Sequence, residues 1–283
     1  MGYIANMLSY PFMQRAFLVG ALVALCSALL GVSLVLKRYS MIGDGLSHVG
    51  FGSLALATVL ASSGNEILQK LGSEPVLFSV PIVLAAAFLL LCLSESSRIN
   101  GDSAIAVIST ASFAFGVMVI SMTTGINTDI FNYMFGSVTA LVGAYVPVYI
   151  ALAAAVLILY LLFYNKLFAV TFDEDFARAS GARTGRYKML LASLTAVTVV
   201  VGMKMIGTML ITALIVLPPL SAMRLFSSFR STVVASGVIS VVCCVLGIAF
   251  SYMFSAPCGA SIVCVNLFVL IASSVFGKLR IKK

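Results

Sequence analysis

Apolar stretches of about 20 residues, separated by short polar clusters, are the dominant pattern of this 283-residue chain. Stretches of that length cross a bilayer as helices, because a helix satisfies every backbone amide within its own segment. Nine candidate spans follow: 16–36, 46–62, 76–93, 103–122, 142–164, 188–203, 205–222, 231–253 and 259–277. The sequence therefore predicts an all-α, polytopic transmembrane helical bundle.

The sixth and seventh spans are the least separated, since only Lys204 and Gly207 mark their boundary. One span followed by a re-entrant hairpin is an alternative, so the bundle has eight or nine spans. Pro218 and Pro219 fall inside the seventh stretch, and two consecutive prolines predict a break or a kink there.

Composition supports the membrane prediction. Hydrophobic residues make up 61% of the chain and charged residues only 9%, whereas a soluble domain carries roughly 25% charged residues. The mean hydropathy is +1.15. These values exclude an ordinary soluble protein and confine the charges to the predicted loops.

The charges also predict an orientation. With nine spans, one side holds fourteen of the seventeen Lys and Arg residues, and the other holds only Arg15, Lys70 and Lys204. Because cytoplasmic loops carry the excess of basic residues, the N-terminus is predicted outside and the C-terminus in the cytoplasm. The net charge of +8 therefore indicates topology and contact with anionic lipid headgroups, and does not indicate nucleic-acid binding.

One polar loop, residues 171–188, holds three of the nine acidic residues and lies on the predicted cytoplasmic side. Residues 173–180 are predicted to form a short helix with acids in its first turn and Gly181 as its C-cap. Apolar residues recur on one edge at helical spacing: Phe172, Phe176 and Ala179. Such a helix docks in a groove of another protein or rests on the bilayer, and periodicity leaves both interpretations open.

The single histidine, His48, follows Asp44 by four residues near the start of the second span. Residues four apart share a helix face, so an imidazole nitrogen and a carboxylate can reach the same cation. Ionisable groups at membrane depth are costly and indicate function. Structural roles remain open for each residue, with Asp44 as a helix N-cap and His48 as a core histidine bonded to a neighbouring helix.

Five segments then occur in order along nearly the whole chain. They are Met41-Ile-Gly-Asp-Gly-Leu-Ser-His48, Gly101-Asp-Ser-Ala-Ile-Ala106, Asp129-Ile-Phe-Asn-Tyr-Met-Phe-Gly136, Phe172 to Gly181, and Ile206-Gly-Thr-Met-Leu-Ile-Thr-Ala-Leu-Ile-Val-Leu-Pro218. Together they resemble the metal-type ABC transporter permeases that import zinc, manganese or iron. The chain departs from that family at Gly45, which replaces a common Ala, and at Val49-Gly-Phe-Gly52, where a Pro-Gly pair often follows. The two extra glycines allow closer helix approach or a bend.

The resemblance implies a single permease domain over residues 1–283, in a bacterial plasma (inner) membrane, and a transport subunit rather than an enzyme. The chain has no Gly-x-x-x-x-Gly-Lys-Ser/Thr loop for ATP phosphates. The implied partners are cytoplasmic ATP-binding subunits, an extracellular metal-binding protein and a second permease subunit, either an identical copy or a close paralogue. No permanently bound cofactor is expected, only the transported divalent metal ion.

The resemblance also assigns residues. It carries metal contact onto Asp44 and His48, and contact with the ATPase onto Phe172, Asp173, Phe176, Ala177 and Gly181. Imidazole and carboxylate suit Zn, Mn and Fe equally, so the sequence does not select the metal. Two ligands are too few for a closed site, but two subunits supply four. An incomplete site suits transport, because a tightly held ion cannot leave.

Other classes of transporter remain as alternatives. A secondary metal carrier driven by an ion gradient also places ionisable residues in its path, and a related permease scaffold imports vitamin or haem chelates. An intramembrane metalloprotease is excluded, because the chain has one histidine and no His-Glu-x-x-His pair. Lys37 and Arg38 place Asp44 near the cytoplasmic end of the second span.

Overall fold

The computed structural model describes residues 10–37, 39–61, 75–94, 101–122, 134–136 and 146–281, and within these ranges it contains helices and connections but no strand. The helices are α2 (Pro11–Leu36), α3 (Ser40–Ala61), α5 (Pro75–Ser94), α6 (Gly101–Ser121), α8 (Val146–Leu162), α9 (Tyr164–Phe172), α10 (Glu174–Ala179), α11 (Thr184–Ile206), α12 (Thr208–Leu225), α13 (Phe229–Phe254) and α14 (Cys258–Ile281). The all-α bundle is confirmed.

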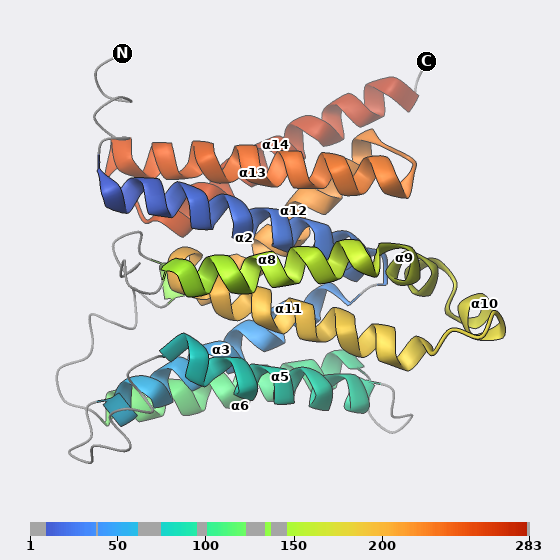
Figure 1. The fold of residues 1–283 in the computed structure, drawn as a ribbon. Helices are drawn as coiled ribbons and strands as arrows, with labels where there is room; N and C mark the ends of the chain where they lie inside the picture. The colour runs from blue at the N-terminus through green and yellow to red at the C-terminus, as the bar shows by residue number, and fades with distance from the viewer. Residues whose placement is uncertain are drawn as a thin grey trace.

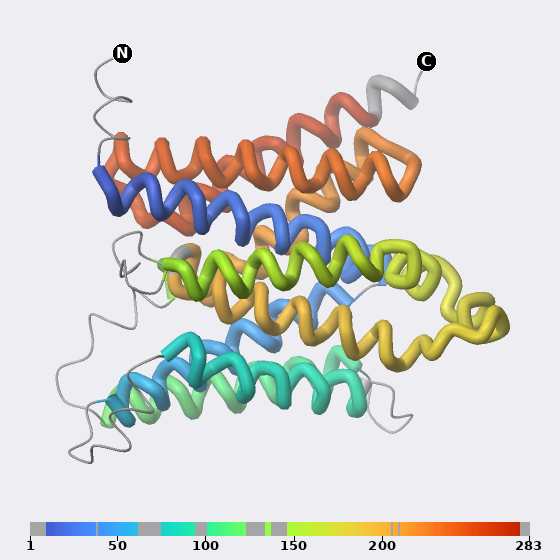
Figure 2. The backbone as a smooth tube through the Cα atoms, in the orientation of Figure 1, coloured from blue at the N-terminus to red at the C-terminus, as the bar shows by residue number. Residues whose placement is uncertain are grey.

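The long helices lie side by side with their axes roughly aligned (Figure 1). α3 packs on α5 and α6 at one side of the bundle, and α13 packs on α2 and α14 at the other. α2 and α11 lie between these groups, because α2 also contacts α8, α11 and α12 while α11 also contacts α3, α5 and α8. α10 lies at one end of the bundle, opposite the first turn of α2 (Figure 2).

In the part of the chain that the structure describes, seven helices are long and apolar enough to span a membrane, and α8 with α9 forms an eighth candidate that is bent by 67°. α12 contributes a shorter apolar stretch, Leu210–Leu225. The sixth and seventh predicted spans are separate helices. α11 ends at Ile206 and α12 begins at Thr208, with Gly207 between them at φ 97°. The bend into α9 was not expected from the sequence.

Of the break or kink predicted at Pro218 and Pro219, the break does not occur, because α12 continues through both prolines. Pro219 has no amide proton for the carbonyl of Ile215, four residues earlier. Gly31 of α2 packs against that carbonyl so closely that a Cβ atom at position 31 would overlap it. A close approach from a neighbouring helix compensates a freed carbonyl inside a bundle, and a glycine makes that approach possible.

Close approach also holds α3 in place. A Cβ atom on Gly52 would lie 2.8 Å from the carbonyl oxygen of Ser112 in α6, and one on Gly50 would lie 2.7 Å from the Met203 sulfur in α11. The interpretation of these glycines as sites of close helix contact is confirmed. Any side chain at Gly52 displaces α6, so the position of α3 depends on these two residues.

Candidate functional site

Asp44 and His48 lie one turn apart within α3, on the same face. The His48 Nε2 and Asp44 Oδ2 atoms are 3.8 Å apart, and the side chains are 16% and 42% exposed respectively. Asp44 is not an N-cap, because α3 begins at Ser40, and its backbone carbonyl already accepts a bond from the Ser47 hydroxyl. The Asp44 carboxylate is therefore not occupied in starting the helix.

The imidazole of His48 lacks the contact that a structural histidine needs. Its ring meets the ring of Phe113 in α6 edge-on at 5.1 Å. Its buried Nδ1 atom has no hydrogen-bond partner among the described residues. Since Nε2 faces the carboxylate, no neighbouring helix holds this side chain by a hydrogen bond in the described ranges.

The pair lies on a strip of α3 that the described helices cover only in part: α6 contacts His48 through Phe113, whereas the Asp44 side chain is 42% exposed. Met41, Asp44 and His48 recur at helical spacing, and the first of them is exposed. The adjacent faces are packed, since Gly43 meets Ile215 and Gly45 meets Ile105. At 1.5 Å per residue, His48 lies about 12 Å from the first residue of α3, in the half nearer α10.

Two ligand atoms in this arrangement can share one ion. Metal bonds to imidazole nitrogen and carboxylate oxygen are each about 2.1 Å long, so their sum exceeds the 3.8 Å separation. Within the described ranges, no group of three or more His, Cys, Asp and Glu side chains exists that could hold a metal. Among the described residues, Asp44 and His48 can therefore supply at most two ligand side chains.

The predicted short helix is confirmed as α10. The Asp173 carboxylate caps it by accepting from the backbone N–H of Phe176 at 2.9 Å. Gly181, at φ 81°, ends it, with the Gly181 N–H donating to Arg178 and the Ala182 N–H donating to Ala177. This pair of bonds is a Schellman motif, which requires the left-handed conformation that glycine adopts readily.

The two sides of α10 differ. Phe176 is 67% exposed, and Phe172 is also exposed although its ring contacts Phe168 and Phe229. Ala177 is only 2% exposed, so its side chain faces the bundle. The predicted apolar edge therefore points outward at Phe172 and Phe176, while Ala177 belongs to the inner side of the helix.

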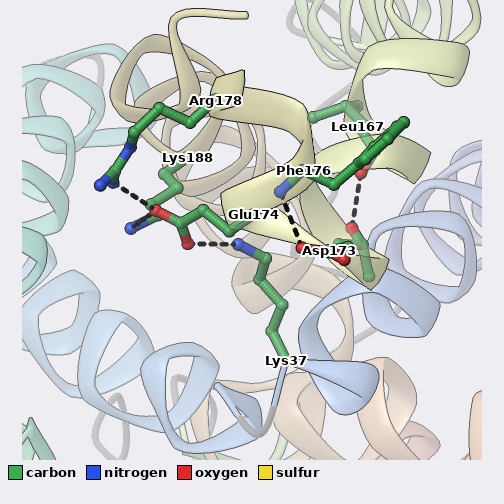
Figure 3. Close-up of polar contacts among 8 residues, drawn as sticks. Lys37, Leu167, Asp173, Glu174, Phe176, Arg178 and Lys188 are labelled. Carbon is green, nitrogen blue, oxygen red and sulfur yellow. Dashed lines mark hydrogen bonds and ion pairs between the residues drawn. The ribbon is translucent and has the colours of Figure 1, made fainter. Parts of the chain in front are cut away.

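A group of charges that the sequence pattern did not reveal lies on that inner side. Glu174 accepts from Lys188 at 2.5 Å, from Lys37 at 3.4 Å and from Arg178 at 3.3 Å (Figure 3). Burial alone raises the pKa of Glu174, but the Lys188 and Lys37 ammonium groups outweigh it and hold that pKa below its ordinary value. Glu174 is thus ionised at neutral pH.

An integral membrane bundle with an open carboxylate–imidazole pair and a short helix at one end defines the class of a membrane transport subunit. The chain matches the ABC 3 transport family over residues 9–277. It belongs to that family. It is a multi-pass protein of the plasma membrane and the permease component of an ABC transporter.

Relatives and a solved structure are similar over nearly the whole chain. The manganese transport system membrane protein MntC of Halalkalibacterium halodurans is 28% identical, over 97% of this chain and 88% of its own length. The manganese import system permease protein ScaB of Streptococcus gordonii is 25% identical, over 96% and 93%. The structure of PsaBC from Streptococcus pneumoniae in complex with Fab superposes with a TM-score of 0.84, at 26% identity and over 99% of both chains.

Proposed function

We propose that this chain is the membrane subunit of an ATP-driven importer of divalent transition-metal ions, and that the ions pass Asp44 and His48. The observation that carries the proposal is the open pair itself. Its ligand atoms are 3.8 Å apart, and the buried Nδ1 of His48 has no partner among the described residues. A structural pair would be covered and fully hydrogen-bonded.

A second permease subunit completes the site in this proposal. The described helices leave Met41 exposed and Asp44 partly exposed, so an identical copy or a close paralogue can place its own pair opposite. Two pairs supply four ligands, the number that a tetrahedral site uses. Because each subunit holds only half, the ion leaves when the two strips separate.

The proposal places the ATP-binding subunits on α10. Phe172 and Phe176 provide an exposed apolar surface, and Asp173 and Gly181 fix the two ends of the helix. Ala177 seats the helix on the bundle, because its side chain is buried. An extracellular metal-binding protein delivers the ion at the opposite end of the single permease domain, which comprises residues 1–283.

In the proposed orientation the N-terminus is outside and the C-terminus is cytoplasmic. The basic residues that meet at the α10 end of the bundle support it, since Lys37, Arg178 and Lys188 all contact Glu174 there. We infer that the N-terminal end of α2 faces the delivery protein.

Manganese is the first ion to test, because two relatives are named for manganese transport. Carboxylate and imidazole ligands suit Mn, Fe and Zn, and the transported ion needs no resident cofactor. The alternatives of a gradient-driven carrier and of a vitamin or haem chelate permease receive no support from these relatives.

The test is ATP-dependent uptake of Mn(II), Zn(II) and Fe(II) into vesicles that contain the assembled transporter. His48→Ala and Asp44→Asn should each lower uptake by about tenfold or more, since each removes one of two ligands. The matched control is Ser47→Ala, which lies between them and bonds only its own helix in the described structure. Unchanged uptake by both ligand variants, at equal amounts of folded complex, would falsify the pathway role.

A further inference from the structure

One carboxylate joins three separate elements near α10. Glu174 is the first residue of α10, Lys37 follows the last residue of α2, and Lys188 lies in the second turn of α11. The carboxylate Oε1 contacts Lys188 at 2.5 Å, and Oε2 contacts Lys37 at 3.4 Å (Figure 3). Both oxygens therefore point inward, to cations that belong to other helices.

These ion pairs are shielded from solvent. The Lys37 and Lys188 side chains are 9% and 12% exposed, so the pairs differ from the exposed surface bridges that contribute little. Removing the carboxylate leaves two ammonium groups, both largely buried, without their shared anion. A partly buried charge that loses its partner is costly, so the position of α10 depends on Glu174.

The packing below the carboxylate is tight. A cavity of about 10 Å³ lies there, room for at most one water, and its lining residues include Leu34, Lys37, Tyr39, Leu167 and Lys188. Close-packed contacts transmit displacement and do not absorb it. A movement of α10 therefore reaches α2 and α11 directly.

Both of these helices adjoin the proposed ion path. Lys37 is in the short connection before Ser40, where α3 begins, and Asp44 is in the second turn of α3. α11 contacts α3 at its other end, where Met203 packs against Gly50. Glu174 is thus the polar link between the outer helix and the two elements that hold α3.

We propose that Glu174 is a positioning residue that transmits the movement of α10 to the α2–α3 junction and to α11; this inference rests on the proposed docking role of α10. Glu174 does not bind the ATPase itself, because its carboxylate oxygens are engaged by Lys37, Lys188 and Arg178. The outward Phe176 remains for the partner.

The test measures metal uptake per ATP hydrolysed in the purified complex with its ATP-binding subunits and delivery protein. Glu174→Gln keeps the shape of the side chain and removes its charge. We expect the variant to retain its ATP-binding subunits and to hydrolyse ATP, while uptake per ATP falls by roughly tenfold. Glu174→Asp retains the charge with a shorter reach and should recover part of the ratio.

Asp175→Asn is the matched control, because it removes the same charge from the next residue, which is exposed and for which the described structure has no ion pair. Asp175→Asn should keep the wild-type ratio of metal uptake to ATP hydrolysed. The inference is overturned if Glu174→Gln keeps the wild-type uptake per ATP. It is also overturned if Asp175→Asn lowers uptake per ATP as much as Glu174→Gln does.

Phe176→Ala separates this inference from the docking proposal. If Phe176→Ala leaves the ATP-binding subunits attached with unchanged affinity, α10 is not the dock, and both proposals fail. If Phe176→Ala weakens their attachment by about tenfold or more while Glu174→Gln keeps its ratio, only the positioning role fails. A Glu174→Gln permease that unfolds or loses its partners counts as a structural role and also contradicts the inference.

Discussion

Two groups of ionisable residues near the same end of the molecule differ in how completely they are paired: Asp44 with His48 in α3, and Glu174 with its cations at α10. In α3, Asp44 and His48 approach only to 3.8 Å, the Asp44 side chain is 42% exposed, and one imidazole nitrogen has no partner in the described structure. At α10, one carboxylate is held by three cations from three helices, and the two that come from other helices are shielded. The Asp44–His48 pair thus has an atom without a partner among the described residues, whereas both carboxylate oxygens of Glu174 contact a cation.

The difference follows from what each group must do. A group that binds an ion and then releases it must keep open coordination positions and avoid deep burial of charge. A group that fixes one helix against others gains from complete pairing, because any unpaired buried charge destabilises it. In the proposed function, incomplete pairing therefore accompanies ion transport at Asp44 and His48, and complete pairing accompanies the positioning role of Glu174.

The largest effect is expected from adding a third metal ligand beside Asp44 and His48, which tests whether an incomplete site is needed for ion release. Met41→His places a third ligand, an imidazole nitrogen, one turn before Asp44 at an exposed position of the same strip. We expect the metal to be held about 10- to 100-fold more tightly, so that it copurifies with the permease while uptake falls. Metal content and uptake of the same preparation measure both effects.

Met41→Leu is the control, because it conserves volume and adds no ligand. It should resemble the wild type in both measurements. Tighter binding with undiminished uptake in Met41→His contradicts the idea that incompleteness allows release.

The span pattern and the placing of Asp44 and His48 on one helix face are predictable from sequence because both depend on local spacing. Apolar length predicts the helices, and the four-residue interval predicts that Asp44 and His48 share a face. The cap of α10 by Asp173 and its end at Gly181 are local too, and the structure has them as expected. The degree to which other helices cover Asp44 and His48, however, depends on which helices lie beside α3.

The features that sequence did not predict are made by distant residues. Lys37 and Glu174 are 137 positions apart, so no periodicity relates them. The continuity of α12 through Pro219 depends on Gly31, which belongs to another helix. The 67° bend at Phe163 likewise places α9 across the bundle end, where Phe168 packs on Phe229. Such contacts are settled by tertiary packing and leave no local pattern.

A second prediction asks whether α10 is held by Glu174 or by its own C-cap. At Gly181 a Cβ atom would meet nothing within 4 Å, but φ is 81°, so Gly181→Ala should destabilise the end of α10 by about 1 kcal/mol. We expect uptake per ATP to remain near the wild-type value, because the Glu174 ion pairs persist. Hydrogen exchange at the end of α10, together with the uptake ratio, measures the two effects.

Gly185→Ala provides the comparison for that variant. This glycine also has open space around it, but it lies within α11 and has no positive φ. Alanine there should be neutral or stabilising by up to about 1 kcal/mol. A loss of coupling in Gly181→Ala as large as that in Glu174→Gln contradicts the view that side-chain charge fixes α10.

The smallest expected effect is the dependence of the Glu174 link on pH. The Lys188 and Lys37 ammonium groups hold the pKa of Glu174 below its ordinary value of 4.5, so the folded protein binds this proton less readily than the unfolded chain. The stability that Glu174 contributes is therefore fully present above pH 4.5 and is lost as the pH falls through the lower, folded pKa. We expect the difference in unfolding free energy between wild type and Glu174→Gln to be on the order of 1 kcal/mol at neutral pH and to shrink below pH 4.5. Asp175→Asn should show no comparable change, because no cation contacts Asp175 within the described residues; a constant difference across this range contradicts an ionised link.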